Sequence, residues 1–294
     1  MPYCERDGVR LFYQQQGEGP DVVLVHAVTS NQAVWVFTGL VEALAADYRV
    51  TSYDLRGHGA SDTPASGYTS ADMVGDLIGL LDHLGIGSAA LVGHSYGGVV
   101  AMHAASLHPD RVVGVILSDS YFPGLRHIEP NLERANVWLD LGETFASVGA
   151  ALPETVSFAE LFRVTAQLTD EQFAALEQRV GLLGRGWLRQ LPRLARTSCA
   201  EDIMAVAGLD EAALRRVAVP VAALYDEHSP FHATCAHLQL LLPRCTVELI
   251  PGAKHLALVQ ATSAFTAAVR RHLARMVPGA RTGQAIGPAT ATTQ

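Results

Sequence analysis

Short apolar runs alternate with helix-like patterns along most of the chain. Each run is continuous and rich in β-branched residues, which is typical of buried strands. The runs cover residues 21–26, 49–54, 88–94, 111–118, 219–225 and 246–250. Between them, apolar residues recur at helical spacing, which predicts helices over residues 32–46, 74–81, 96–107, 233–241 and 257–275. This alternation predicts parallel βαβ units and therefore an α/β fold.

The stretch from residue 121 to residue 216 interrupts the alternation. It contains three pairs with the spacing of a capping box, which marks the start of a helix: Ser157/Glu160, Thr169/Gln172 and Ser198/Glu201. We therefore expect a mostly helical lid over the strand ends, where open α/β sheets bind ligands. The expected units are a core of residues 1–120 and 217–276, a lid of residues 121–216, and a disordered tail of residues 277–294.

The composition narrows the class of protein. Of the 294 residues, 49% are hydrophobic and 17% are charged, which is typical of a globular protein with a large buried core. The formal net charge of −8 argues against a nucleic-acid partner, because binding to phosphates needs basic residues. The first residues show no signal-peptide pattern and no stretch is apolar enough to span a bilayer, so we expect a cytoplasmic protein without a membrane partner.

The cysteines and histidines give no signal for a disulfide framework or a metal. The four cysteines, at positions 4, 199, 235 and 245, have no paired spacing. His228 and His232 have the i, i+4 spacing of a metal pair, but Pro230 lies between them and no glutamate motif accompanies them. No metal and no cofactor are expected.

The candidate nucleophile is Ser95, in the sequence Gly93-His94-Ser95-Tyr96-Gly97. This G-x-S-x-G motif lies between a predicted strand and a predicted helix, which is the context of a nucleophile elbow. The glycines allow two chain segments to pass closely at a tight turn. The backbone amide of Tyr96 would lie at a helix N-terminus, where it can stabilise a developing oxyanion. The alternative interpretation is a glycine-rich turn with a buried serine.

With this motif the chain resembles the α/β-hydrolase superfamily, up to about residue 275. The sequence from Val25 to Val28, followed by Trp35, is similar to the His-Gly loop of that family, with Ala27 where glycine is usual. The resemblance implies that the Val28 amide is the second oxyanion donor. It also implies that His58, in the sequence from 54 to 61, has a structural role in its loop.

The resemblance implies that His255 is the general base. His255 follows the last predicted strand and precedes the last predicted helix, which is where the family has its catalytic histidine. There it would take the proton of the attacking serine and return it to the leaving group.

The triad acid departs from the usual family pattern. The strand at 219–225 ordinarily ends in a glycine with the acid three residues later, but Asp226 and Ser229 occupy these positions. Two carboxylates could replace the acid: Asp119, which follows the strand at 111–118 and is favoured, and Asp226, with Glu227 beside it as a weaker choice. A displaced acid is similar to the pattern of zearalenone-type lactonases and of cofactor-independent quinaldine dioxygenases.

These residues together predict a serine hydrolase that cleaves a small, apolar carboxylic ester or lactone through an acyl-enzyme. Trp138, Phe162 and Trp187 of the lid are candidates for an apolar or aromatic substrate pocket, although they could equally pack the lid onto the core. Two alternatives keep the same fold: a cofactor-independent dioxygenase of a hydroxylated heteroaromatic, and a ligand-binding receptor. The sequence leaves the oligomeric state open.

Overall fold

The computed structural model describes residues 2–130 and 136–277, and its centre is a single eight-stranded sheet. The strand order is β1-β2-β4-β3-β5-β6-β7-β8. The sheet is parallel from β4 to β8, and β2 pairs antiparallel with β1 and β4. The strands are β1 (Tyr3–Arg6), β2 (Val9–Gln16), β3 (Asp21–Val25), β4 (Arg49–Tyr53), β5 (Ala89–His94), β6 (Val112–Ser118), β7 (Val221–Asp226) and β8 (Cys245–Ile250).

All six predicted strands are present within one or two residues of the expected bounds, so the α/β fold is confirmed. The sequence pattern missed β1 and β2. The C-terminal half of β2, Tyr13 to Gln16, is polar and partly exposed, so it forms no continuous apolar run.

Alternate residues of the parallel strands supply two separate cores. Leu91 of β5 belongs to one cluster, with side chains from α3 (Ser70–His83), α4 (Tyr96–Leu107) and α11 (His232–Leu241). Ala90 and Val92 belong to the other, with side chains from α1 (Ala33–Phe37), α2 (Leu40–Ala45), α12 (Ala257–Gln260) and α13 (Thr262–Met276). Because successive side chains of a strand point to opposite faces, the apolar runs of β3 to β7 are buried on both faces, whereas the edge strand β8 is only partly buried.

Two of the predicted core helices are each divided in two. The helix expected at 32–46 is interrupted at Gly39, whose φ of 73° ends α1 before α2 begins. The helix expected at 257–275 is interrupted at Ala261, between α12 and α13.

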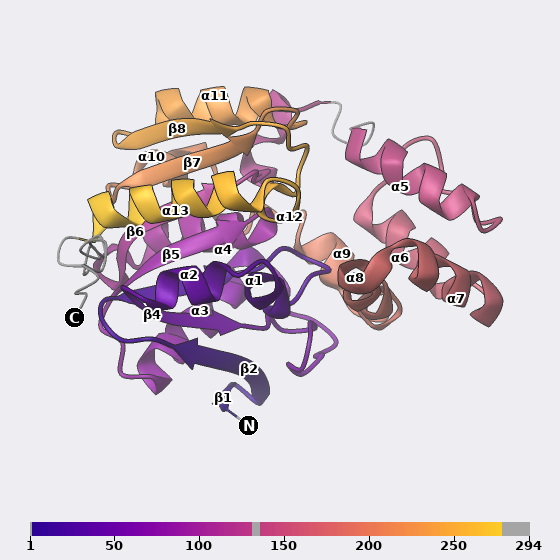
Figure 1. Cartoon of the computed structure of the whole chain (residues 1–294), viewed down its shortest axis with the longest axis horizontal. Coiled ribbons are helices and arrows are strands. Elements are labelled where there is room, and N and C mark those ends of the chain that lie inside the picture. Colours follow the sequence, from indigo (N-terminus) through magenta and orange to yellow (C-terminus); the bar gives the residue numbers. More distant parts are fainter. Residues whose placement is uncertain (1, 131–135, 278–294) are drawn as a thin grey trace, which may run out of the picture.

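Helices dominate the insertion between β6 and β7. They are η2 (Pro123–Ile128), α5 (Asn136–Ala146), α6 (Phe158–Ala166), α7 (Asp170–Arg179), α8 (Gly181–Leu194), α9 (Cys199–Asp202) and α10 (Glu211–Arg215). In Figure 1, α5 to α9 form a group beside the sheet, whereas α10 lies with the core, where it contacts α4. Because α10 lies within the predicted lid range but packs with the core, the lid boundaries at residues 121 and 216 stay a prediction. The predicted tail lies outside the described residues except for Val277.

Two of the three predicted helix caps form. The Ser157 hydroxyl accepts the Glu160 N–H at the start of α6, and Thr169 forms a complete capping box with Gln172 at the start of α7. The third prediction was wrong in its geometry: Ser198 does not cap α9, and its hydroxyl instead donates to Asp202. Its φ of −75° and ψ of 8° are not the extended conformation that an N-cap requires.

Within residues 2–130 and 136–277, no helix combines the length and the apolar character needed to cross a bilayer.

Candidate active site

Ser95 occupies a sharp turn between β5 and α4. Its backbone has φ 52° and ψ −119°, a conformation that is unfavourable for a residue with a side chain, and its N–H donates to the Ser118 carbonyl at 2.8 Å. The flanking glycines are required sterically. A Cβ at Gly97 would lie 2.1 Å from the Val25 carbonyl oxygen, and one at Gly93 would lie 2.3 Å from the Gly97 oxygen. The turn presents a half-buried Ser95 at the carboxyl edge of the sheet.

Asp119 follows β6, the neighbour of β5. The two strands pair with His94 opposite Ser118, so Ser95 and Asp119 are the next residues of adjacent strands. The Asp119 side chain is fully buried, and its Oδ2 accepts a hydrogen bond from Nδ1 of His255 at 2.6 Å. Its Oδ1 accepts the Asp226 N–H at 3.1 Å. Both carboxylate oxygens are therefore held by donors.

His255 reaches this carboxylate from the loop between β8 and α12. With Nδ1 donating to Asp119, Nε2 is the nitrogen that can accept a proton. The His255 ring lies 5.2 Å from the ring of His94, the neighbour of Ser95, and packs edge-on against Phe231 at 5.5 Å. Since its side chain is only 18% exposed, solvent competes little with the Asp119 contact.

Asp226, the alternative acid, is buried beside this pair and has a different set of contacts. Its Oδ2 accepts the Ala257 N–H at 3.0 Å, and among the described residues its Oδ1 has no hydrogen-bond partner. Burial, reinforced by the negative charge of Asp119, raises the pKa of Asp226 to about 7. Asp226 thus anchors the chain two residues beyond His255, whereas Asp119 contacts the imidazole itself.

Ser229 occupies the usual position of the family acid and has a local role. Its hydroxyl accepts the Phe231 N–H at 2.9 Å, which shapes the loop before α11. Glu227 accepts the Gly252 N–H at 2.8 Å and is exposed. Neither side chain is placed to orient His255.

The loop after β3 forms a tight turn at residues 27–30. The Ser30 N–H donates to the Ala27 carbonyl at 3.0 Å, and Thr29, in the third position, has φ 69°. The Thr29 N–H donates to Nε2 of His58 at 3.0 Å. Burial lowers the pKa of His58 to about 3, so the ring is neutral and its Nε2 remains an acceptor. His58 therefore supports the turn, in keeping with its predicted structural role.

Val28 and Tyr96, the predicted oxyanion donors, lie at the ends of neighbouring strands. Val28 is in the turn after β3, and Tyr96 is the first residue of α4, after β5. These strands pair with Val25 opposite Gly93. The first amides of a helix have no acceptor within the helix. The Val28 turn and the start of α4 thus follow adjacent strands at the carboxyl edge of the sheet, where Ser95 lies.

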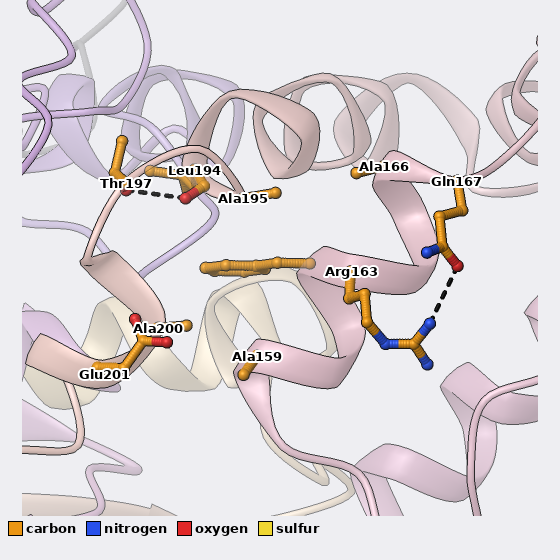
Figure 2. Close-up of a pocket in the computed structure, with 10 residues that line it drawn as sticks. Ala159, Arg163, Ala166, Gln167, Leu194, Ala195, Thr197, Ala200 and Glu201 are labelled. Carbon is orange, nitrogen blue, oxygen red and sulfur yellow. Dashed lines mark hydrogen bonds between the residues drawn. The ribbon is translucent and has the colours of Figure 1, made fainter.

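The predicted pocket residues of the lid have different surroundings. Phe162 is 2% exposed and lines a cavity of ≈ 240 Å³ between α6, α8 and α9, which neither Ser95 nor His255 lines. Figure 2 shows Arg163 and Gln167 at one end of this cavity and Thr197 and Glu201 at the other. Trp187 is partly buried against the core cluster, and the side chain of Trp138 lies outside the described residues.

The match to a known family agrees with this architecture. A family model described as alpha/beta hydrolase fold matches residues 20–262. The chain therefore belongs to the α/β-hydrolase family, and its relatives support a hydrolase of that fold.

Individual relatives extend over most of the chain. The 2-(acetamidomethylene)succinate hydrolase of Mesorhizobium japonicum is 30% identical over 255 residues, which cover 84% of this chain and 85% of that protein. The esterase RhEst1 from Rhodococcus sp. ECU1013 has a TM-score of 0.71 at 25% identity and covers 93% of this chain and 98% of its own. Est816, described as an N-acyl homoserine lactone degrading enzyme, shares the fold, with a TM-score of 0.66, 24% identity, and 92% and 99% coverage. Two epoxide hydrolases match over only 38% and 33% of their own length.

Proposed function

We propose that this chain hydrolyses a carboxylic ester or lactone through an acyl-enzyme on Ser95. The observation that carries the proposal is the 2.6 Å hydrogen bond between His255 and the buried carboxylate of Asp119, whose strand lies next to the one that ends in the strained elbow of Ser95. Asp119 would hold the imidazole in the tautomer with a free Nε2 and stabilise the imidazolium that forms when Nε2 takes the serine proton.

The remaining steps are proposed for the same residues. Ser95 Oγ attacks the carbonyl carbon, and the amides of Val28 and Tyr96 stabilise the resulting oxyanion. His255 then donates its proton to the leaving alkoxide. Water, deprotonated by the same imidazole, hydrolyses the acyl-enzyme and regenerates the serine.

The substrate class is proposed from the nucleophile and from the names of the relatives. An esterase and a lactone-degrading enzyme are among the solved structures with this fold. Epoxide hydrolysis through a carboxylate nucleophile needs an aspartate at position 95, where this chain has serine.

The test compares the wild type with Ser95→Ala on p-nitrophenyl esters of increasing acyl length and on simple lactones. We expect multiple turnovers by the wild type, loss of turnover in Ser95→Ala, and an increase in the intact mass of the wild type by one acyl group. Turnover by Ser95→Ala at the wild-type rate would refute the acyl-enzyme.

A further inference from the structure

One buried side chain of the lid connects α8 to the turn that carries Val28. Gln190 of α8 is 4% exposed, although glutamine is usually at the surface. Its Nε2 donates to the carbonyls of Ser30 at 3.0 Å and Thr29 at 3.3 Å, and also to that of Gly186 in its own helix at 3.0 Å. Its Oε1 accepts the Gly59 N–H at 2.9 Å. The three partners outside α8 precede it by 131 to 161 positions in the sequence. In Figure 1, α8 is in the part of the lid nearest the core.

The turn that Gln190 contacts is strained. Thr29 is β-branched and has φ 69°, a conformation that such residues rarely adopt without support from their surroundings. Support comes from two sides: His58 of the core holds the Thr29 N–H, and Gln190 of the lid holds the Thr29 carbonyl. The peptide groups on both sides of Thr29 are therefore fixed, one by each part of the molecule.

Val28 immediately precedes this residue, so its amide direction depends on the conformation of the turn. We propose that Gln190 is a positioning residue that couples docking of lid helix α8 to the oxyanion geometry of the Ala27–Ser30 turn. This inference rests on the proposed function, in which the Val28 amide stabilises the oxyanion. When α8 separates from the core, two buried carbonyls lose their donor and Thr29 can relax. A substrate that holds the lid closed thus favours the active form of the site.

Arg193 provides a matched control on the same helix. It also ties α8 to the core, since it donates to the Gly59 carbonyl at 3.3 Å and to Thr63. No described contact joins Arg193 to residues 27–30. Loss of lid docking alone would therefore appear in both Arg193→Met and Gln190→Met, whereas loss of turn geometry is specific to Gln190→Met.

The experiment measures steady-state kinetics and amide hydrogen exchange in the full-length wild type and in Gln190→Met, Gln190→Glu and Arg193→Met. Gln190→Glu keeps an acceptor for the Gly59 N–H, removes the donors to the Thr29, Ser30 and Gly186 carbonyls and places an oxygen against them, so it serves as the second variant if Gln190→Met folds poorly. We expect kcat on a p-nitrophenyl ester to fall about 10- to 100-fold in both Gln190 variants, while KM stays within about 3-fold of the wild-type value. An oxyanion donor stabilises mainly the transition state, so its displacement lowers kcat more than it changes substrate binding. The amides of Thr29 and Ser30 should exchange at least ~10-fold faster. Arg193→Met should change neither quantity by as much.

Unchanged exchange of the turn amides in the Gln190 variants would overturn the coupling, as would equal effects in Arg193→Met. Faster exchange of the turn in a protein that shows no acyl transfer would uphold the coupling and overturn only the proposed function. The two failures are therefore distinguishable.

Discussion

Replacing Asp226 with asparagine should change how the stability of the protein depends on pH. Asp226 is fully buried at the end of β7, with one oxygen on the Ala257 N–H and the other without a hydrogen-bond partner in the described structure. The negative charge of Asp119 disfavours a second charge there, while His255 and the Ala257 amide favour it less strongly. An amide of the same size keeps the contact to Ala257 and cannot ionise.

The magnitude follows from the pKa of Asp226, which is raised to about 7 in the folded state from an ordinary value near ~4. Because the folded state prefers the neutral carboxyl, the contribution to stability is present below pH ~4 and is lost as the pH rises through ~7. A difference of about three pH units corresponds to at most ~4 kcal/mol at 1.36 kcal/mol per unit. Water penetration and relaxation around the buried charge reduce this, so we expect ~2 kcal/mol.

The assay is urea unfolding of the wild type and Asp226→Asn, followed by circular dichroism at several values between about pH 4.5 and about pH 8.5. The unfolding free energy of the wild type should fall relative to that of Asp226→Asn as the pH rises, and the difference should level off above pH ~8. A difference that is constant across this range would show that Asp226 does not change its charge in the folded protein between these pH values.

Two further predictions concern the elbow and the core. Gly97→Ala should lower the rate of ester hydrolysis by more than ~100-fold, because a Cβ there would lie 2.1 Å from the Val25 oxygen. Gly87→Ala is the control and should have wild-type kinetics, because no atom lies within 4 Å of a Cβ at that position. Equal rates in the two variants would contradict the steric argument. Arg56→Met should lower the unfolding free energy by about 3–5 kcal/mol in urea unfolding, since it removes the guanidinium that binds both oxygens of the buried Asp76 carboxylate and leaves only Arg6, at 3.9 Å, as a counter-charge. Loss of less than ~1 kcal/mol, as expected for an exposed pair, would show that Arg6 replaces Arg56.

The sequence predicted those parts of the structure that are determined by a few consecutive residues. Strands buried on both faces are continuous apolar runs, so β3 to β7 stand out, and the elbow is defined by five consecutive residues. The polar half of β2 has no such run. The choice between Asp119 and Asp226 could not be made from spacing, because both follow neighbouring strands and only the path of the His255 loop decides which carboxylate it meets.

The role of Gln190 could not be predicted from the sequence for a different reason. Its hydrogen-bond partners outside α8 are backbone groups of two distant loops, and a glutamine on an amphipathic helix is normally expected to face solvent. No local pattern distinguishes it from the exposed glutamines of the same lid. Contacts of this kind depend on how the lid helices meet the core, which the sequence pattern leaves undetermined.

The most direct test of the account is the rate at which a fluorophosphonate probe labels the protein, with the adduct mapped by mass spectrometry, in the wild type, Asp119→Asn and Asp226→Asn. We expect an adduct on Ser95, a labelling rate at least ~100-fold lower in Asp119→Asn, and a labelling rate within ~10-fold of wild type in Asp226→Asn. Equal losses in the two variants would contradict the assignment of Asp119 as the acid. A folded wild type without an adduct on Ser95 would contradict the nucleophile itself and would favour the dioxygenase or the receptor.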